Sequence, residues 1–160
     1  MTRSLLLAGL LGGLLGGVFS TLASRWLPGP ATSAAAIPVP AEARATADAY
    51  VARLRAGKYD EFVNDLKNGM VFPSEKEFDE FRRSFELYRT VIPGIYGPLS
   101  GDVTLVRESA ATPDLARFVY LQKCPNGLVV WTFIMYRGAE GWRPSTVSWS
   151  HDPLRAFPGP

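Results

Sequence analysis

A change in hydrophobic rhythm near residue 100 is the feature that most constrains the fold of this chain. Before that point, apolar side chains recur every three or four residues, which is the spacing of one face of an α-helix. After it, apolar residues alternate with polar ones or form short continuous runs, as they do in strands. Helices followed by a meander of strands predict an α+β domain, with three N-terminal helices packed on an antiparallel sheet.

Three helical segments are expected before the change. The first has an apolar stripe over residues 47–54 and ends at Gly57, and the second repeats the spacing over residues 59–66 and ends at Asn68-Gly69. The third opens at Ser74 with Glu77 in capping-box spacing, and it is expected to close at Pro93-Gly94. One side of this third helix is aromatic.

Four strands are expected after the change, at residues 102–108, 117–124, 128–136 and 142–149. Pro125-Asn126-Gly127 between two apolar runs predicts a hairpin. The third strand is apolar on both faces, so its second face needs a cover that the helices cannot supply. The candidate covers are a second copy of the chain, the spacer folding back, or the C-terminal tail with Leu154 and Phe157.

An uncharged apolar run follows Arg3 and predicts export, because it has the pattern of a secretory signal or a membrane anchor. Two outcomes stay open. Thr21-Leu22-Ala23 is a tripeptide that signal peptidase accepts, which would make Ser24 the first mature residue. The run exceeds a usual signal core and spans about 28 Å as a helix, which favours an uncleaved anchor through residues 4–23. Both outcomes place the folded domain outside the cytoplasm, either tethered to the membrane or secreted.

The remaining organisation follows from proline content. Residues 27–40 read LPGPATSAAAIPVP, and such a segment is a semi-rigid spacer because proline blocks regular structure and the other side chains are too small to form a core. The chain therefore divides into a signal peptide or anchor at 1–26, a spacer at 27–41, an α+β domain at 42–152 and an irregular tail at 153–160.

Composition excludes several classes of function. The formal net charge is only +2, so nucleic acid is not expected as a partner. A single cysteine, Cys124, permits no intramolecular disulfide, and one histidine with one cysteine cannot make a typical zinc site. No glycine-rich loop stands between a strand and a helix, as a nucleotide site would require. No metal or cofactor is expected.

Two local motifs and the order of the elements point to a family. AYVARLRAGKYDEFVNDL contains the helix break Gly57-Lys58-Tyr59, and YRGAEGWRPSTVSW contains Gly141-Trp142-Arg143 at the opening of the last strand. With a third helix ending near LYRTVIPG, residues 42–150 resemble the nuclear transport factor 2-like superfamily. That resemblance implies a curved sheet wrapped around a helix as a cone, with a pocket at the open end and a homodimer through the sheet face. The same cone hosts isomerases, dehydratases and members without activity, so the fold alone does not give the chemistry.

Enzymes of that superfamily move a proton with an acid, a histidine or a tyrosine inside the cone. Asp102 and His151 are the candidates in this chain, but each is also the ordinary residue of a turn or strand end, and no catalytic residue is assigned. The predicted pocket lining is aromatic, although core packing explains the same residues. It comprises Tyr50, Phe85, Tyr88, Tyr120, Trp131 and Phe133.

Two functions remain. The first is a non-catalytic binding module, membrane-tethered or exported, that takes a partner protein or a small apolar ligand. The alternative is a small acid/base enzyme of the isomerase or dehydratase kind that uses the cone cavity. A carboxylate or imidazole buried in a roomy pocket would favour the enzyme, and a cone filled by aromatic side chains would favour the binding module.

Overall fold

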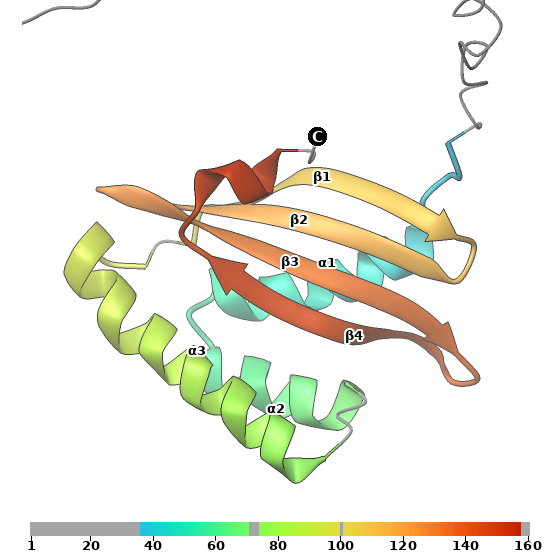
Figure 1. Ribbon diagram of the computed structural model, residues 1–160, viewed down its shortest axis with the longest axis horizontal. Helices are drawn as coiled ribbons and strands as arrows, with labels where there is room; N and C mark the ends of the chain where they lie inside the picture. Colours follow the sequence, from blue (N-terminus) through green and yellow to red (C-terminus); the bar gives the residue numbers. More distant parts are fainter. Residues whose placement is uncertain (1–35, 71–73, 100, 158–160) are drawn as a thin grey trace, which may run out of the picture. The chain divides into compact units, whose positions relative to one another are not determined.

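The elements follow the order predicted from the sequence. The computed structural model describes residues 36–70, 74–99 and 101–157, in which three helices precede a four-stranded antiparallel sheet (Figure 1). The α+β prediction is therefore confirmed. The predicted N-terminal hydrophobic helix, and most of the spacer, lie outside the described residues. None of the helices within the described residues is long and apolar enough to cross a membrane.

The first two helices form a bent pair around a glycine. Helix α1 (Ala41–Arg55) buries Ala43, Ala47, Val51 and Leu54 along one face, and α2 (Tyr59–Gly69) buries Phe62 and Leu66. Gly57 lies between them with a φ of 67°, a conformation that residues with a Cβ rarely adopt. The predicted break is thus in place.

Helix α3 (Glu75–Tyr96) begins as predicted but ends later. The Ser74 side chain accepts a hydrogen bond from the backbone N–H of Glu77, which caps the first turn. The prediction that the helix closes at Pro93-Gly94 is wrong, because Pro93 lies inside it. Tyr96 packs against the core, and this packing favours one further turn over an end at the proline. The helix then stops at Gly97, whose φ is 86°.

The sheet is a simple meander with the order β1-β2-β3-β4. Its strands are β1 (Val103–Thr112), β2 (Leu115–Cys124), β3 (Gly127–Gly138) and β4 (Gly141–Ser150). Each predicted strand is present, and β1 is four residues longer at its C-terminal end than predicted. Pairing shifts between Leu105 and Arg107, so Val106 has no paired residue and the alternation of β1 changes phase there. β1 has another shift between Ala110 and Thr112, and the pairing of β3 with β4 shifts between Ile134 and Met135, next to Pro144 of β4.

The predicted β2–β3 hairpin is present, with a small difference at the turn. Cys124 pairs with Gly127, so the two loop residues are Pro125 and Asn126. Gly127 is needed for space rather than for its φ, because a Cβ there would collide with the ring of Tyr96. The backbone N–H of Asn126 also donates to the carbonyl of Tyr96 at 2.9 Å. These contacts join the end of α3 to the β2–β3 turn.

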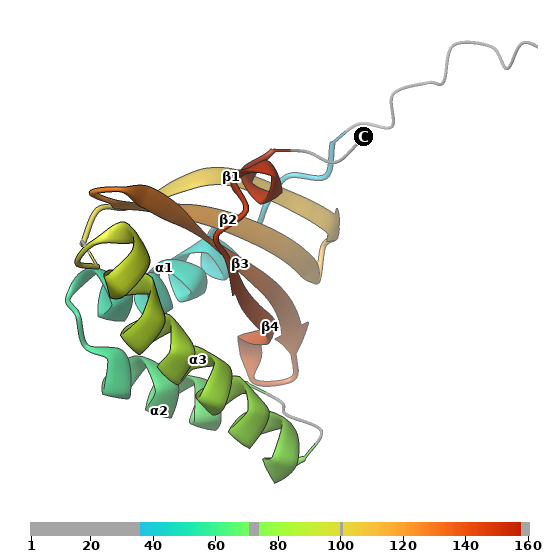
Figure 2. The same cartoon turned by 60° about the vertical axis from the view of Figure 1, so that its left-hand side comes forward.

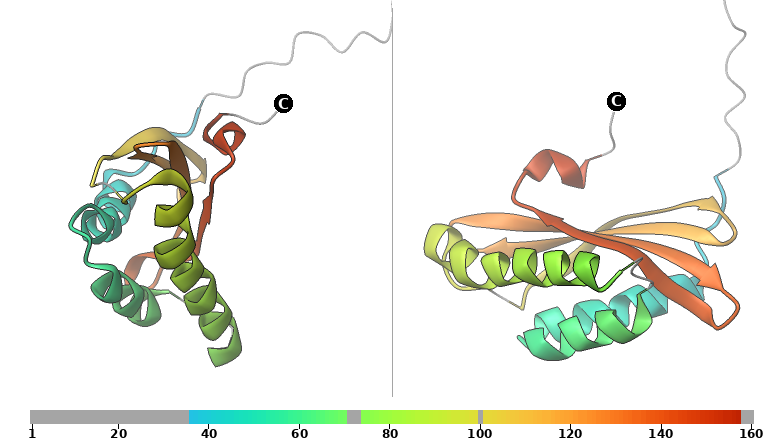
Figure 3. Two further views of the ribbon diagram at one scale, coloured as in Figure 1. Left: turned by 90° about the vertical axis from the view of Figure 1, so that its left-hand side faces the viewer. Right: turned by 60° about the horizontal axis from the view of Figure 1, so that its bottom comes forward.

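The two faces of the sheet have different covers. The helices pack on one face, and a short 3₁₀ helix, η2 (Pro153–Ala156), lies on the other (Figures 2 and 3). Val119 and Val130 face away from the helices and are nevertheless buried, and η2 contacts their strands, β2 and β3. The C-terminal tail therefore supplies part of the missing cover, but not through Leu154 and Phe157 as predicted, because both side chains are exposed. The sequence had predicted an irregular tail, and η2 corrects that prediction for Pro153–Ala156. Asp152 caps η2 by accepting a hydrogen bond from the N–H of Leu154.

Candidate functional site

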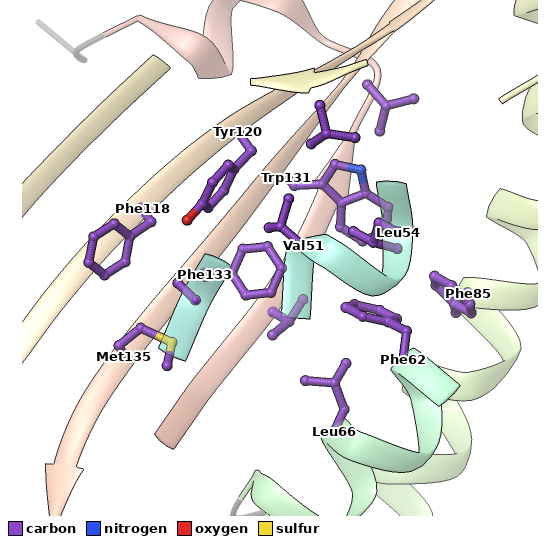
Figure 4. Packing of buried hydrophobic residues seen from close by; sticks show 14 of the residues in the cluster. Val51, Leu54, Phe62, Leu66, Phe85, Phe118, Tyr120, Trp131, Phe133 and Met135 are labelled. Atoms are coloured by element: carbon purple, nitrogen blue, oxygen red, sulfur yellow. The ribbon is translucent and has the colours of Figure 1, made fainter. Parts of the chain in front are cut away.

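The six aromatic residues predicted to line a pocket come together in the core. They are Tyr50, Phe85, Tyr88, Tyr120, Trp131 and Phe133. Tyr50 is half-buried, and the other five are completely buried. The ring centroids of Tyr88 and Trp131 lie 4.8 Å apart, and those of Tyr120 and Phe133 lie 5.7 Å apart, both pairs edge to face. Figure 4 shows Tyr120, Trp131 and Phe133 on adjacent strands, pointing toward the helices.

Phe62 of α2 completes this aromatic cluster, although the sequence had not marked it as a site residue. Its ring centroid lies 5.8 Å from that of Trp131 and 5.3 Å from that of Phe85 (Figure 4). Aromatic pairs at these separations are in favourable contact. The signal for Phe62 was present in the helical stripe at residues 59–66, since an apolar position on the buried face of a helix must meet the sheet. Rings thus fill the centre of the space between sheet and helices.

Gln122 of β2 is the buried polar side chain of this cluster. Its Oε1 accepts hydrogen bonds from the Tyr88 hydroxyl at 2.7 Å and from the Trp131 indole N–H at 3.1 Å. Burial raises the pKa of the Tyr88 hydroxyl far above its usual range, and the neighbouring Tyr59 adds to that effect. Tyr88 is therefore a permanent donor at neutral pH. The burial of Gln122 was not predicted from the sequence. The alternation along β2 could have indicated it, because Gln122 is in phase with the inward-facing Tyr120.

A second polar group surrounds Tyr120 at the α1–β2 contact. The Tyr120 hydroxyl donates to Asp48 at 2.9 Å, and Asp48 in turn lies 3.7 Å from Arg44, which also pairs with Glu108. Burial raises the pKa of Tyr120, and the hydrogen bond to Asp48 raises it further. The hydroxyl stays protonated, so it serves as a structural donor rather than as a base.

The two candidate proton-transfer residues lie apart from the aromatic cluster. Asp102 pairs with Lys123 at 3.3 Å, and about half of its side chain is exposed. His151 is exposed beyond the end of β4, with its ring 6.3 Å from that of Tyr96. Neither side chain is enclosed in an apolar cavity. The arrangement expected of an acid/base enzyme is thus not built from these two residues.

The remaining candidate chemistry is sparse. Cys124 is half-buried at the end of β2, as expected for a packed residue at a strand end. Within residues 36–70, 74–99 and 101–157, no three side chains of histidine, cysteine, aspartate or glutamate are grouped so that they could hold a metal ion.

Comparison with known proteins adds no further constraint. No protein-family model matches the chain, and no curated protein or solved structure is significantly similar to it.

Proposed function

We propose that this chain is an exported, non-catalytic binding module that contacts a partner protein through its outer surface. The observation that carries the proposal is the filled interior. Aromatic rings from α2, α3, β2 and β3 occupy the place in which a ligand or substrate would have to lie. The exposed positions of Asp102 and His151 support the same conclusion, because proton transfer usually depends on a group shielded from water.

The outer side of α3 is the surface that fits a protein partner. Leu87, Val91 and Ile95 follow one another at intervals of four residues and are 58%, 45% and 57% exposed. Residues at that spacing form a stripe along one side of a helix. Contiguous exposed apolar side chains are typical of protein–protein contact surfaces. We call these three residues the α3 stripe, and we propose that it packs into an apolar groove of the partner.

Export and tethering are part of the proposal and rest on the sequence of residues 4–23. N-terminal sequencing of the native protein separates the two outcomes. Ser24 as the first residue would mean a secreted protein, and retention of Arg3 would mean a membrane anchor. Recovery of the folded domain in the cytosolic fraction would contradict both.

We also propose that the domain is a nuclear transport factor 2-like cone. The pairing shifts in β1 and between β3 and β4 support this, because bulges bend a strand and increase its twist. The corresponding alternative for the oligomeric state, which the resemblance implies, is a homodimer through the sheet face. Analytical ultracentrifugation of the full chain would contradict it by giving the monomer mass across the micromolar range.

Site-specific photocross-linking tests the binding module. A photoreactive amino acid at Leu87 is expected to give a discrete adduct in the cell, and the same group at Lys76 is the control, because Lys76 lies on the exposed first turn of α3 outside the stripe. Val91→Asp is expected to abolish the Leu87 adduct without changing the circular dichroism of the protein. Equal adducts at both positions, or an adduct unaffected by Val91→Asp, would contradict the proposed contact.

Two further measurements address the other functions. Asp102→Asn and His151→Gln are expected to leave the cellular phenotype of the gene unchanged, and loss of function in either folded variant would favour the acid/base enzyme. Titration with an apolar fluorescent probe is expected to leave the fluorescence of Trp131 unquenched, because no probe molecule binds inside the domain. Saturable quenching, lost in Trp131→Phe, would instead show a ligand inside the cone.

A further inference from the structure

Three arginines that have no side-chain partner among the described residues gather around one groove on the face of the sheet that bears η2. They are Arg107 of β1, Arg117 of β2 and Arg155 of η2, and they line a shallow groove of about 300 Å³ together with Leu154 and Phe157. Asp152 also lines this groove, where its carboxylate caps η2. We call the three arginines, Leu154 and Phe157 the η2 face.

The lack of partners distinguishes these arginines. Every other arginine in the described residues bonds to a carboxylate or to a backbone carbonyl, whereas the side chains of Arg107, Arg117 and Arg155 do neither. Three cations concentrated beside a single carboxylate leave the groove with a net positive charge. A guanidinium group forms its strongest hydrogen bonds with carboxylate or phosphate oxygens. The charge therefore fits an anionic occupant.

The apolar residues of the η2 face project outward. Leu154 is 73% exposed and Phe157 is 63% exposed, although both lie on a segment that is packed against the sheet. Protruding apolar side chains beside cationic ones are the pattern of a surface that rests in the interface of an anionic bilayer. A small soluble anion would use the arginines and leave these two side chains without a role.

The chain enters the domain on the same side. The first described residues, 36–40, rise past the β1–β2 end of the sheet to the side on which η2 lies, opposite the helices (Figure 3). Seventeen residues, from Ser24 to Pro40, separate the apolar run from α1, and their extended length is at most about 60 Å. A domain anchored through residues 4–23 is thus held within reach of the bilayer with the η2 face available to it.

From these observations we propose that the η2 face docks on an anionic lipid bilayer, the three arginines binding lipid phosphates while Leu154 and Phe157 enter the headgroup region. The docking rests on the proposed membrane tether. A second copy is a poorer occupant, because a symmetric sheet-to-sheet contact would bring two sets of unpaired arginines together. Docking on this face would leave the α3 stripe directed away from the membrane.

A spin label at Leu154 tests the proposal in the full chain. The label is placed by Leu154→Cys in a Cys124→Ser background, and the protein is reconstituted into vesicles of phosphatidylcholine alone or with phosphatidylglycerol. A label at Lys76, introduced in the same way on the helical side, is the control. We expect the Leu154 label to become accessible to oxygen and shielded from a water-soluble relaxant only in the phosphatidylglycerol vesicles, and the Lys76 label to stay exposed to water in both.

Replacing Arg107, Arg117 and Arg155 by glutamine is expected to lower the equilibrium constant for docking by about a hundredfold. Salt at 1 M is expected to have a similar effect. In both cases the leader still holds the chain on the vesicles. A chain bound to vesicles whose Leu154 label stays in water would overturn the docking alone. A chain that binds neither kind of vesicle would overturn the tether as well. Dipolar broadening between Leu154 labels, without contact with lipid, would overturn the proposal by showing that a second copy of the chain occupies the η2 face.

Discussion

Gln122→Leu is the substitution that probes the aromatic cluster most directly. Leucine is close to glutamine in size but lacks the side-chain amide, so the substitution removes Oε1, the acceptor for the Tyr88 hydroxyl and the Trp131 N–H. Each buried donor left without an acceptor costs about 1–3 kcal/mol. Both donors are fully buried and cannot turn to water. We therefore expect the free energy of unfolding to fall by about 2–6 kcal/mol, a large share of the total for a domain of this size.

The assay is urea unfolding of the full chain in mild detergent, followed by tryptophan fluorescence and by far-ultraviolet circular dichroism. Adding Tyr88→Phe to the Gln122→Leu variant supplies the control. If Gln122→Leu leaves the Tyr88 hydroxyl without an acceptor, then removing that hydroxyl should raise the free energy of unfolding by about 1 kcal/mol relative to Gln122→Leu alone. The second substitution then removes an unsatisfied buried donor and breaks no hydrogen bond. Alone, Tyr88→Phe should be destabilising.

Two results would refute this reasoning. The first is a Gln122→Leu variant whose unfolding free energy lies within about 0.5 kcal/mol of the original, since surface-like substitutions fall in that range. The second is a double variant in which the two losses simply add. Additivity would mean that the side chains do not share the buried hydrogen bond that the structure assigns to them.

Three further predictions use other contacts. Gly127→Ala should lower the free energy of unfolding by about 1–3 kcal/mol, and with it the melting temperature, because the new methyl group meets the ring of Tyr96. In a Tyr96→Ala background, Gly127→Ala should cost much less. Arg55→Met should cost about 1–2 kcal/mol in urea unfolding, since the guanidinium donates to the carbonyl of Val103 at 2.7 and 2.9 Å. Burial raises the folded-state pKa of the buried Tyr88 and Tyr120 hydroxyls, so their contribution to stability is complete below pH 9. Because an unfolded tyrosine loses its proton near pH 10, stability should then fall by about 1.4 kcal/mol per pH unit for each hydroxyl, as a pH series of urea unfolding can check.

The change of hydrophobic period was sufficient to predict the order of the elements, because each helix and strand buries one face against the other layer. The errors come from places where packing overrides a local rule. Pro93 is a strong local signal for a helix end, but the contact of Tyr96 with the core outweighs it. The extra residue at Val106 breaks the alternation of β1, so a period of two could not be followed beyond Glu108.

The candidate site shows a different limit. The sequence could group the six aromatic residues because they are large, apolar and in phase, and the same properties make them fill the core. Gln122 and the η2 face were not found. Gln122 reads as an ordinary polar residue until its strand is placed, and the three arginines come from three separate elements, so only the folded chain shows that they share a groove.

The two outermost strands of the meander affect how the molecule behaves at high concentration. Strands β1 and β4 each leave one row of backbone groups unpaired, which invites another chain to add to the sheet. Pro144 has no N–H to offer along β4, and the bulge at Val106 distorts β1. Both edge strands therefore disfavour the addition of further chains to the sheet. The protein can reach a high concentration on a surface without polymerising through its edge strands.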